Sequence, residues 1–203
     1  MESAQPSANG GIRMNSNPVI ALSGPRCCGK STIAQHLVER HGFVRIAFAD
    51  ALREIAQLAG DDLANDRMYL ANLGSKLREL QTNFLIDVMR TKIARSKQPV
   101  VVEDIRFPSE FEFCKSIDAV TIRLEIPEQI QYERLLSRDG KSGEDATELI
   151  ACMDESMLDE IKTWDYTINA VGDFRFLSDT IQLLSKKNSS EFSNPNEKNE
   201  VIA

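Results

Sequence analysis

Between residues 19 and 32 the chain reads VIALSGPRCCGKST. Its first residues are apolar and predict a short buried strand, and a helical pattern begins at Lys30. The eight residues from Gly24 to Ser31 have the spacing G-x-x-x-x-G-K-S, the Walker A pattern in the strand-to-helix context that it requires. This combination predicts a phosphate-binding loop, and the alternative is a glycine-rich turn that holds no ligand.

Each fixed position of the loop has a physical reason. Gly24 and Gly29 permit backbone conformations and a close approach that a Cβ would block, so that successive N–H groups can point at a β-phosphate. Lys30 can reach the β and γ oxygens, the Ser31 hydroxyl can ligate Mg²⁺, and Thr32 can reach the α-phosphate. We therefore expect ATP and Mg²⁺ as the cofactors.

Two cysteines fill variable positions of this loop, Cys27 and Cys28. We expect both to line the nucleotide as tolerated small residues, with a redox switch at the helix N-terminus as the alternative. Together with Cys114 and Cys152 they show no CxxC spacing, which indicates reduced thiols in a reducing compartment. The sequence thus predicts a cytoplasmic protein.

Composition and charge set the remaining limits. A chain of 203 residues with 42% apolar and 27% charged side chains is typical of one globular domain. The net charge of −7 and the lack of a Lys/Arg run argue against duplex nucleic acid as a partner. Neither a signal peptide nor an apolar run of about 20 residues is apparent, which argues against a membrane partner. Residues 18–185 are expected to form the domain, and the polar segments 1–17 and 186–203 are expected to be flexible tails.

Short runs rich in Val and Ile alternate with helical patterns along the domain. This alternation predicts an α/β fold, a P-loop NTPase three-layer sandwich with a five-stranded parallel sheet, a helical acceptor-binding region and a lid. The expected strands are 19–22, 43–48, 100–103, 120–126 and 166–169, and the expected helices are 30–40, 51–59, 63–81, 84–96, 109–116, 128–138, 145–153 and 174–185. A stripe of Leu70, Leu73, Leu77, Leu80 and Phe84 is expected to pack in the core, with a homodimer seam as the alternative.

Residues 100–110, VVVEDIRFPSE, form a second informative segment, because a buried strand ends there in two carboxylates and an arginine. Ligands of such sheets bind at the carboxyl ends of the strands. Asp104 or Glu103 can hold Mg²⁺ through water, and Arg106 can grip an acceptor anion with two hydrogen bonds. The alternative is a surface ion pair that closes the strand.

Further candidates lie on predicted helices. Asp50 and Arg53 lie one turn apart at a helix start, where Asp50 suits the N-cap, and capping alone would explain it. Arg78 is either another anion-binding group or part of a solvated helix face. Arg138 precedes a glycine-containing loop that suits a lid, so we expect it to reach transferring phosphates.

The two histidines, His36 and His41, lie off the apolar face of the first predicted helix and near its end. We assign both of them to the surface.

An ordered set of motifs adds a family resemblance. The motifs are FADALR at 48–53, Leu73-Gly74 with Arg78, EDIRFPSE at 103–110 and WDYTIN at 164–169. Over residues 19–183 the chain resembles the deoxynucleoside monophosphate kinases of the P-loop kinase group, and is less similar to dephospho-coenzyme A kinase and animal-type phosphomevalonate kinase. The resemblance implies that Lys30 and Ser31 contact the donor phosphates and Mg²⁺, that Arg53 and Arg106 lie near the acceptor, that Arg138 belongs to the lid and that Asn169 lies near the donor base.

The expected activity is phosphoryl transfer from ATP to a small-molecule acceptor, a (deoxy)nucleoside monophosphate. A phosphate is already an anionic nucleophile, whereas a hydroxyl acceptor benefits from a carboxylate base, so Asp50 discriminates between the two. The alternatives are a hydroxyl-acceptor kinase, acting on dephospho-coenzyme A or on a modified base in DNA, and a regulatory module that senses ATP without transfer.

Overall fold

The computed structural model describes residues 17–139, 157–172, 174 and 178–183. In this part of the chain five strands form one sheet in the order β2-β3-β1-β4-β5, and every pair is parallel. The strands are β1 (Val19–Ser23), β2 (Val44–Ala47), β3 (Val100–Glu103), β4 (Val120–Glu125) and β5 (Tyr166–Asn169). The predicted α/β fold with a five-stranded parallel sheet is confirmed.

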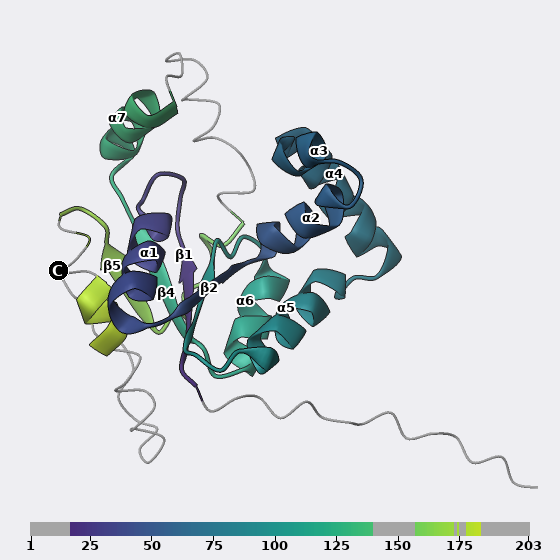
Figure 1. Ribbon diagram of the computed structural model, residues 1–203. Helices are drawn as coiled ribbons and strands as arrows, with labels where there is room; N and C mark the ends of the chain where they lie inside the picture. The colour runs from purple at the N-terminus through teal and green to yellow at the C-terminus, as the bar shows by residue number, and fades with distance from the viewer. Residues whose placement is uncertain (1–16, 140–156, 173, 175–177, 184–203) are drawn as a thin grey trace, which may run out of the picture.

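Helices cover both faces of the sheet and give three layers (Figure 1). On β1, Val19 and Ala21 face the cluster that includes α5 (Phe84–Arg95) and α6 (Pro108–Ser116). The alternate residues Ile20 and Leu22 face the cluster of α1 (Lys30–His41). Since successive strand side chains point to opposite faces, a strand buried on both sides is largely apolar, as β1 is from Val19 to Leu22.

Three further helices form a separate region next to the carboxyl end of β2 (Figure 1). They are α2 (Phe48–Gln57), α3 (Asp61–Asn65) and α4 (Arg67–Leu80). Helix α7 (Glu128–Asp139) follows β4 and lies on the other side of the same edge of the sheet. The two groups of helices therefore flank the edge at which the phosphate loop begins.

One predicted helix is wrong, because 63–81 is divided into α3 and α4. Asp66 has an extended backbone and its side chain accepts hydrogen bonds from the backbone N–H groups of Met68 and Tyr69, at 2.9 and 3.1 Å. A carboxylate that satisfies two N–H groups starts a new helix and so ends the preceding one. The apolar spacing continues across Asp66, so it predicts a single helix.

The predicted core packing of the leucine stripe is confirmed except at Leu80. Leu70, Leu73 and Leu77 pack against the core, whereas the side chain of Leu80 is exposed. Helix α4 ends at Leu80, so Phe84 opens α5 and packs in the core from a different helix.

Several expectations fall on other parts of the chain. The predicted helix 145–153 and nearly all of both predicted tails lie outside the described residues, and of the predicted helix 174–185 only 174 and 178–183 are described. No helix in the described part is both long and apolar enough to cross a membrane.

Candidate active site

The carboxyl edge of the sheet opens into a cavity of about 1410 Å³. Its wall is formed by the phosphate loop and the start of α1, the end of β2 with α2, one face of α4, the β3–α6 connection and α7. This is the edge at which open α/β sheets bind ligands, because loops from several strands converge there. The cavity brings together most of the residues that the sequence singled out.

The loop backbone requires glycine at two positions. Gly24 has φ +147°, and a Cβ built on it would lie 2.5 Å from the carbonyl oxygen of Leu124. Gly29 has φ +102°, and a Cβ there would run into the ring of Phe174. The space next to both residues is thus closed to a side chain, and the positive end of α1 begins directly after the loop. The loop suits a phosphate, whose oxygens need only backbone donors.

Lys30 folds back over this loop. Its Nζ donates hydrogen bonds to the carbonyl oxygens of Gly24, at 2.7 Å, and Pro25, at 3.0 Å. The same nitrogen lies 3.7 Å from a carboxylate oxygen of Asp104. Although Lys30 is buried, its charge lies in the wall of the cavity, between the loop and the end of β3.

A continuous polar chain runs from the loop to α2 and consists of Ser31, Glu103, Arg45, Asp50 and Arg53. The Ser31 hydroxyl donates to Glu103, whose other oxygen accepts from Arg45 Nε. Arg45 pairs with Asp50 at 2.8 Å, and Asp50 pairs with Arg53 at 2.7 Å. The buried carboxylate of Glu103 is therefore satisfied on both of its oxygens.

The oxygen ligands suited to Mg²⁺ lie at one end of this chain. A serine hydroxyl and two carboxylates at the end of β3 are the hard donors that Mg²⁺ prefers, so the residues fit the ion. Of the two carboxylates predicted for this role, Glu103 contacts Ser31 directly, whereas Asp104 turns toward Lys30 and Arg106. Asp104 achieves this turn with φ +67°, a left-handed conformation that Asp tolerates better than most residues.

Asp104 is held in its charged form. Its Oδ2 accepts hydrogen bonds from Arg106, at 2.9 Å from Nε and 2.7 Å from Nη2. Burial alone would raise the pKa of Asp104, but the charges of Lys30 and Arg106 outweigh that effect and lower the pKa. The end of β3 thus presents a stable negative charge next to the loop lysine.

Three arginines that follow the loop in the chain, Arg53, Arg78 and Arg106, line the same cavity, and we call them the arginine wall. Arg78 donates to Glu110 at 3.2 Å and lies over the ring of Phe107, 4.2 Å from its centroid. Glu110 also accepts from the backbone N–H groups of Arg106, at 3.0 Å, and Phe107, at 3.3 Å. These contacts fix Arg78, which excludes the alternative of a solvated helix face.

Glu110 contrasts with Asp104 in its electrostatics. It is 3% exposed, and this burial raises its pKa despite the opposing hydrogen bonds and the charge of Arg78. A carboxylate buried this deeply must be satisfied by hydrogen bonds. The three donors to Glu110 come from α4 and from the β3–α6 connection, so these elements meet at this residue of α6.

Asp50 does not cap a helix, so that prediction is wrong. Helix α2 begins at Phe48 rather than 51, and the N-cap position is Ala47, which makes no side-chain hydrogen bond. Asp50 lies in the first turn, where its carboxylate binds Arg45 and Arg53. It does not itself line the cavity in the described part of the chain.

The predicted lid arginine is Arg138. Arg138 belongs to α7, but its side chain lies outside the described residues. One turn earlier, Arg134 donates to the carbonyl oxygens of Cys27, at 3.2 Å, and Ala170, at 3.4 Å, and lies 5.1 Å from the ring centroid of Phe174. The sequence prediction placed Arg138 ahead of Arg134 in this segment, although a spacing of four puts both on one helix face.

Other predicted and missed residues have clear positions. Thr32 and Cys27 line the cavity, whereas Cys28 is fully buried under the loop. Asn169 is exposed at the end of β5, and Phe174 rather than Asn169 belongs to the described cavity wall. Arg45 was also missed, although a charge within the apolar sequence of β2 could have drawn attention to it.

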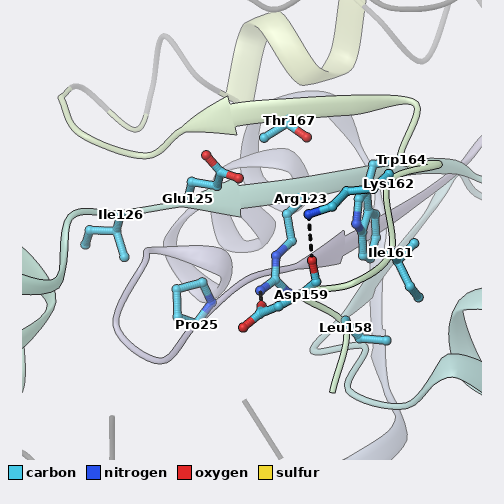
Figure 2. Close-up of a pocket in the computed structure, with 10 residues that line it drawn as sticks. All are labelled: Pro25, Arg123, Glu125, Ile126, Leu158, Asp159, Ile161, Lys162, Trp164 and Thr167. Carbon is cyan, nitrogen blue, oxygen red and sulfur yellow. Dashed lines mark hydrogen bonds and ion pairs between the residues drawn. The ribbon is translucent and has the colours of Figure 1, made fainter. Parts of the chain in front are cut away.

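A second, smaller hollow of about 400 Å³ lies beside the loop (Figure 2). Arg123 extends from β4 toward Pro25 and pairs with Asp159, and it also donates to the Ser23 hydroxyl at 3.1 Å. Lys162 donates to the carbonyl oxygen of Asp159 at 3.0 Å. These groups are bound to one another, so we take the larger cavity as the active site.

Fold, Walker A loop and charged cavity together define a P-loop kinase, that is, a phosphotransferase with a nucleotide-binding loop. A family model described as AAA domain matches residues 20–160, and the chain belongs to this family. The regulatory alternative without transfer is thereby set aside.

Individual relatives agree with this class. A protein described as a deoxynucleotide monophosphate kinase, from Acanthamoeba polyphaga mimivirus, is 25% identical over 145 residues, which cover 54% of this chain and 74% of the viral protein. Similar folds occur in a shikimate kinase from Bacteroides thetaiotaomicron (17% identity, TM-score 0.56, covering 84% of this chain and 97% of that one) and a gluconokinase from Sinorhizobium meliloti (14% identity, TM-score 0.52, covering 88% and 96%). At such identities the two structures bear on the fold alone.

Proposed function

We propose that this kinase transfers the γ-phosphoryl group of ATP to a small acceptor that itself carries a phosphate, a (deoxy)nucleoside monophosphate. The P–O bond to the β-phosphate breaks, a new P–O bond forms to an acceptor phosphate oxygen, and ADP leaves. The observation that carries the proposal is the arginine wall, which lines the same cavity as the phosphate loop.

The phosphate loop would bind the phosphoryl donor, ATP. Its backbone N–H groups and the start of α1 would bind the β-phosphate, and Lys30 would move from the carbonyls of Gly24 and Pro25 to the β and γ oxygens. Ser31, with Glu103 and Asp104, would hold Mg²⁺, with Glu103 better placed to reach the ion together with Ser31. When bound, Mg²⁺ neutralises charge on the phosphate oxygens.

The arginine wall would bind the phosphate of the acceptor. Guanidinium groups bind phosphate oxygens through two parallel hydrogen bonds. Each of the three arginines is paired with a carboxylate, but a guanidinium has five N–H donors and its carboxylate takes only one or two of them. Arg78 is pre-positioned by Glu110 and Phe107, which lowers the entropy cost of binding an anion. This set of oriented guanidinium donors supports an anionic acceptor.

The hydrogen bonds of Asp50 also favour a phosphate acceptor. A hydroxyl acceptor must lose a proton during transfer and benefits from a carboxylate base with a free oxygen near it. Both oxygens of Asp50 already accept hydrogen bonds, from Arg45 and Arg53. A phosphate acceptor needs no such base, so this arrangement favours it over a hydroxyl acceptor. The viral relative's description as a deoxynucleotide monophosphate kinase adds independent support.

The test is a coupled ADP-release assay of the full chain with ATP and Mg²⁺. The acceptor panel contains the deoxynucleoside and ribonucleoside monophosphates, dephospho-coenzyme A, shikimate and gluconate, and Lys30→Met serves as the blank. We expect ADP release to depend on one or two monophosphates. Release with a hydroxyl acceptor alone would refute the proposed acceptor class, and ATP binding without release for any acceptor would refute the proposed activity.

A further inference from the structure

Outside the active site, the two histidines of this chain converge on one carboxylate. His36 and His41 are the only histidines in the sequence and both belong to α1, while Asp179 belongs to the helical residues 178–183. The Nε2 atom of His41 lies 2.8 Å, and that of His36 3.7 Å, from the same oxygen, Oδ1 of Asp179. The sequence assigns both histidines to the surface; in the structure both are partly buried and face Asp179.

The three groups are positioned by packing. Only 14% of the His36 side chain and 22% of the His41 side chain are exposed, so both rings are largely enclosed. The rings lie edge to face, with centroids 6.1 Å apart and planes at 72°. Nearby, Ile181 packs in the same core cluster as Ile33 and Leu37 of α1, which sets residues 178–183 beside this helix (Figure 1).

From this convergence we propose that His36, His41 and Asp179 form a binding site for a transition-metal ion of the zinc type. All three ligand atoms lie within 4.8 Å of one another. A tetrahedral ion with ligand bonds of about 2.0–2.1 Å holds its ligand atoms about 3.3 Å apart. The two separations from Asp179 Oδ1, 2.8 and 3.7 Å, lie on either side of that value, and the two imidazole nitrogens lie within 4.8 Å of each other, so side-chain movements can bring the three ligands onto one ion.

The donor set selects the kind of ion. Two imidazoles and one carboxylate suit Zn²⁺ and its neighbours in the first transition row, whereas Mg²⁺ takes oxygen ligands. The site is thus chemically distinct from the oxygen ligands at Ser31 and Glu103. Asp179 is 57% exposed, which leaves the ion a route in and room for a water as fourth ligand.

The site has a structural consequence. Two ligands come from α1, which follows the phosphate loop, and one comes from a segment more than a hundred residues later in the chain. Bound metal would join the two segments and stabilise the folded state, since binding requires ligands that are brought together only by folding.

The test is a titration of metal-free full-length protein with Zn²⁺, in excess Mg²⁺ and without ATP, followed by calorimetry and thermal unfolding. We expect one Zn²⁺ per chain with a micromolar or tighter Kd and a higher Tm. Loss of one ligand in His41→Gln or Asp179→Asn should weaken binding at least about 10–100-fold and abolish the rise in Tm. The exposed Asp179→Asn variant keeps the test valid if the more buried histidine variant folds poorly.

Two controls separate this site from other ligands. Glu39→Gln removes a carboxylate from the exposed face of the same helix and should bind Zn²⁺ like the wild type. Co²⁺ in place of Zn²⁺ should give visible bands without thiolate charge transfer, which excludes the cysteines. Unchanged binding in a His36→Gln/His41→Gln double variant, or no binding up to about 100 µM Zn²⁺, would overturn the proposal and leave only a histidine–aspartate ion pair.

Discussion

The two ends of the active-site cavity are built in different ways. The loop end uses consecutive residues, and its form depends on backbone conformation at Gly24 and Gly29. The arginine wall uses side chains from α2, α4 and the β3–α6 connection, each bound to a carboxylate: Arg53 to Asp50, Arg78 to Glu110 and Arg106 to Asp104. The loop thus follows from a local motif, whereas the arginine wall requires the whole fold to bring its charges together.

The largest effect is expected at the loop end. Lys30→Met removes the charge and keeps most of the aliphatic stem, so kcat should fall by about 10²–10³-fold, or about 2.7–4 kcal/mol of transition-state stabilisation. The stability should change little because the stem remains packed. ADP release and thermal unfolding measure the two quantities. Lys76→Ala, which removes an equal charge from the exposed face of α4, should behave as the wild type.

A smaller and more selective effect is expected at the wall. Arg78→Ala should lower kcat/KM for the acceptor by about 10–100-fold, since it removes a charge-assisted hydrogen bond of about 1.5–3 kcal/mol. The KM for ATP should stay within about twofold, because the contacts of Arg78 are with Glu110 and Phe107 rather than with the loop. Steady-state kinetics with each substrate varied in turn provide the measurement. An equal loss of kcat/KM for ATP would contradict the assignment of Arg78 to acceptor binding.

Two carboxylates that hold the arginine wall, Asp104 and Glu110, should differ in their response to pH. The pKa of Asp104 is lowered from its ordinary value of 3.8, so its stabilisation is present above that pH and lost as the pH falls through the lowered value. The pKa of Glu110 is raised from 4.5, so its contribution is present below pH 4.5 and lost as the pH rises through the raised value.

Urea unfolding from pH 3 to 7 tests this contrast with Asp104→Asn and Glu110→Gln. The stability difference between wild type and Asp104→Asn should shrink as the pH falls. The difference between wild type and Glu110→Gln should instead shrink as the pH rises. Parallel slopes for the two variants would contradict the opposite electrostatics assigned to these carboxylates.

The smallest effect is expected at Asp50. With a monophosphate acceptor, Asp50→Asn should change kcat by less than about fivefold, because an anionic nucleophile needs no base. Its KM for the acceptor should rise modestly, since Arg53 loses the charge that orients it. A loss of kcat beyond a hundredfold in the same ADP-release assay would assign Asp50 a proton-transfer role and favour a hydroxyl acceptor.

The difference between the two ends also explains what the sequence could predict. The loop and the five strands depend on local patterns, and they were predicted with boundaries within about two residues. The division at Asp66 was missed because the apolar spacing continues across it. A single capping side chain outweighed that periodicity.

The wall was predictable only in part. The residue types of Arg53, Arg78 and Arg106 suggested anion binding, but their partners lie far away in sequence. Glu110 contacts Arg78 from 32 positions later, and Glu103 contacts Arg45 from 58 positions later. No local pattern reports such pairs, because they exist only once β2, β3 and α4 have met.

The polar chain from Ser31 to Arg53 has a thermodynamic consequence. Donor and acceptor groups alternate along it without a break, and charged members are neutralised by their neighbours. Removing one member leaves the next with an uncompensated charge, so the penalty of a first substitution already includes part of the penalty of a second. Free energies measured at Glu103 and at Arg45 are therefore not separable, and a double substitution should cost less than the sum of the two single ones.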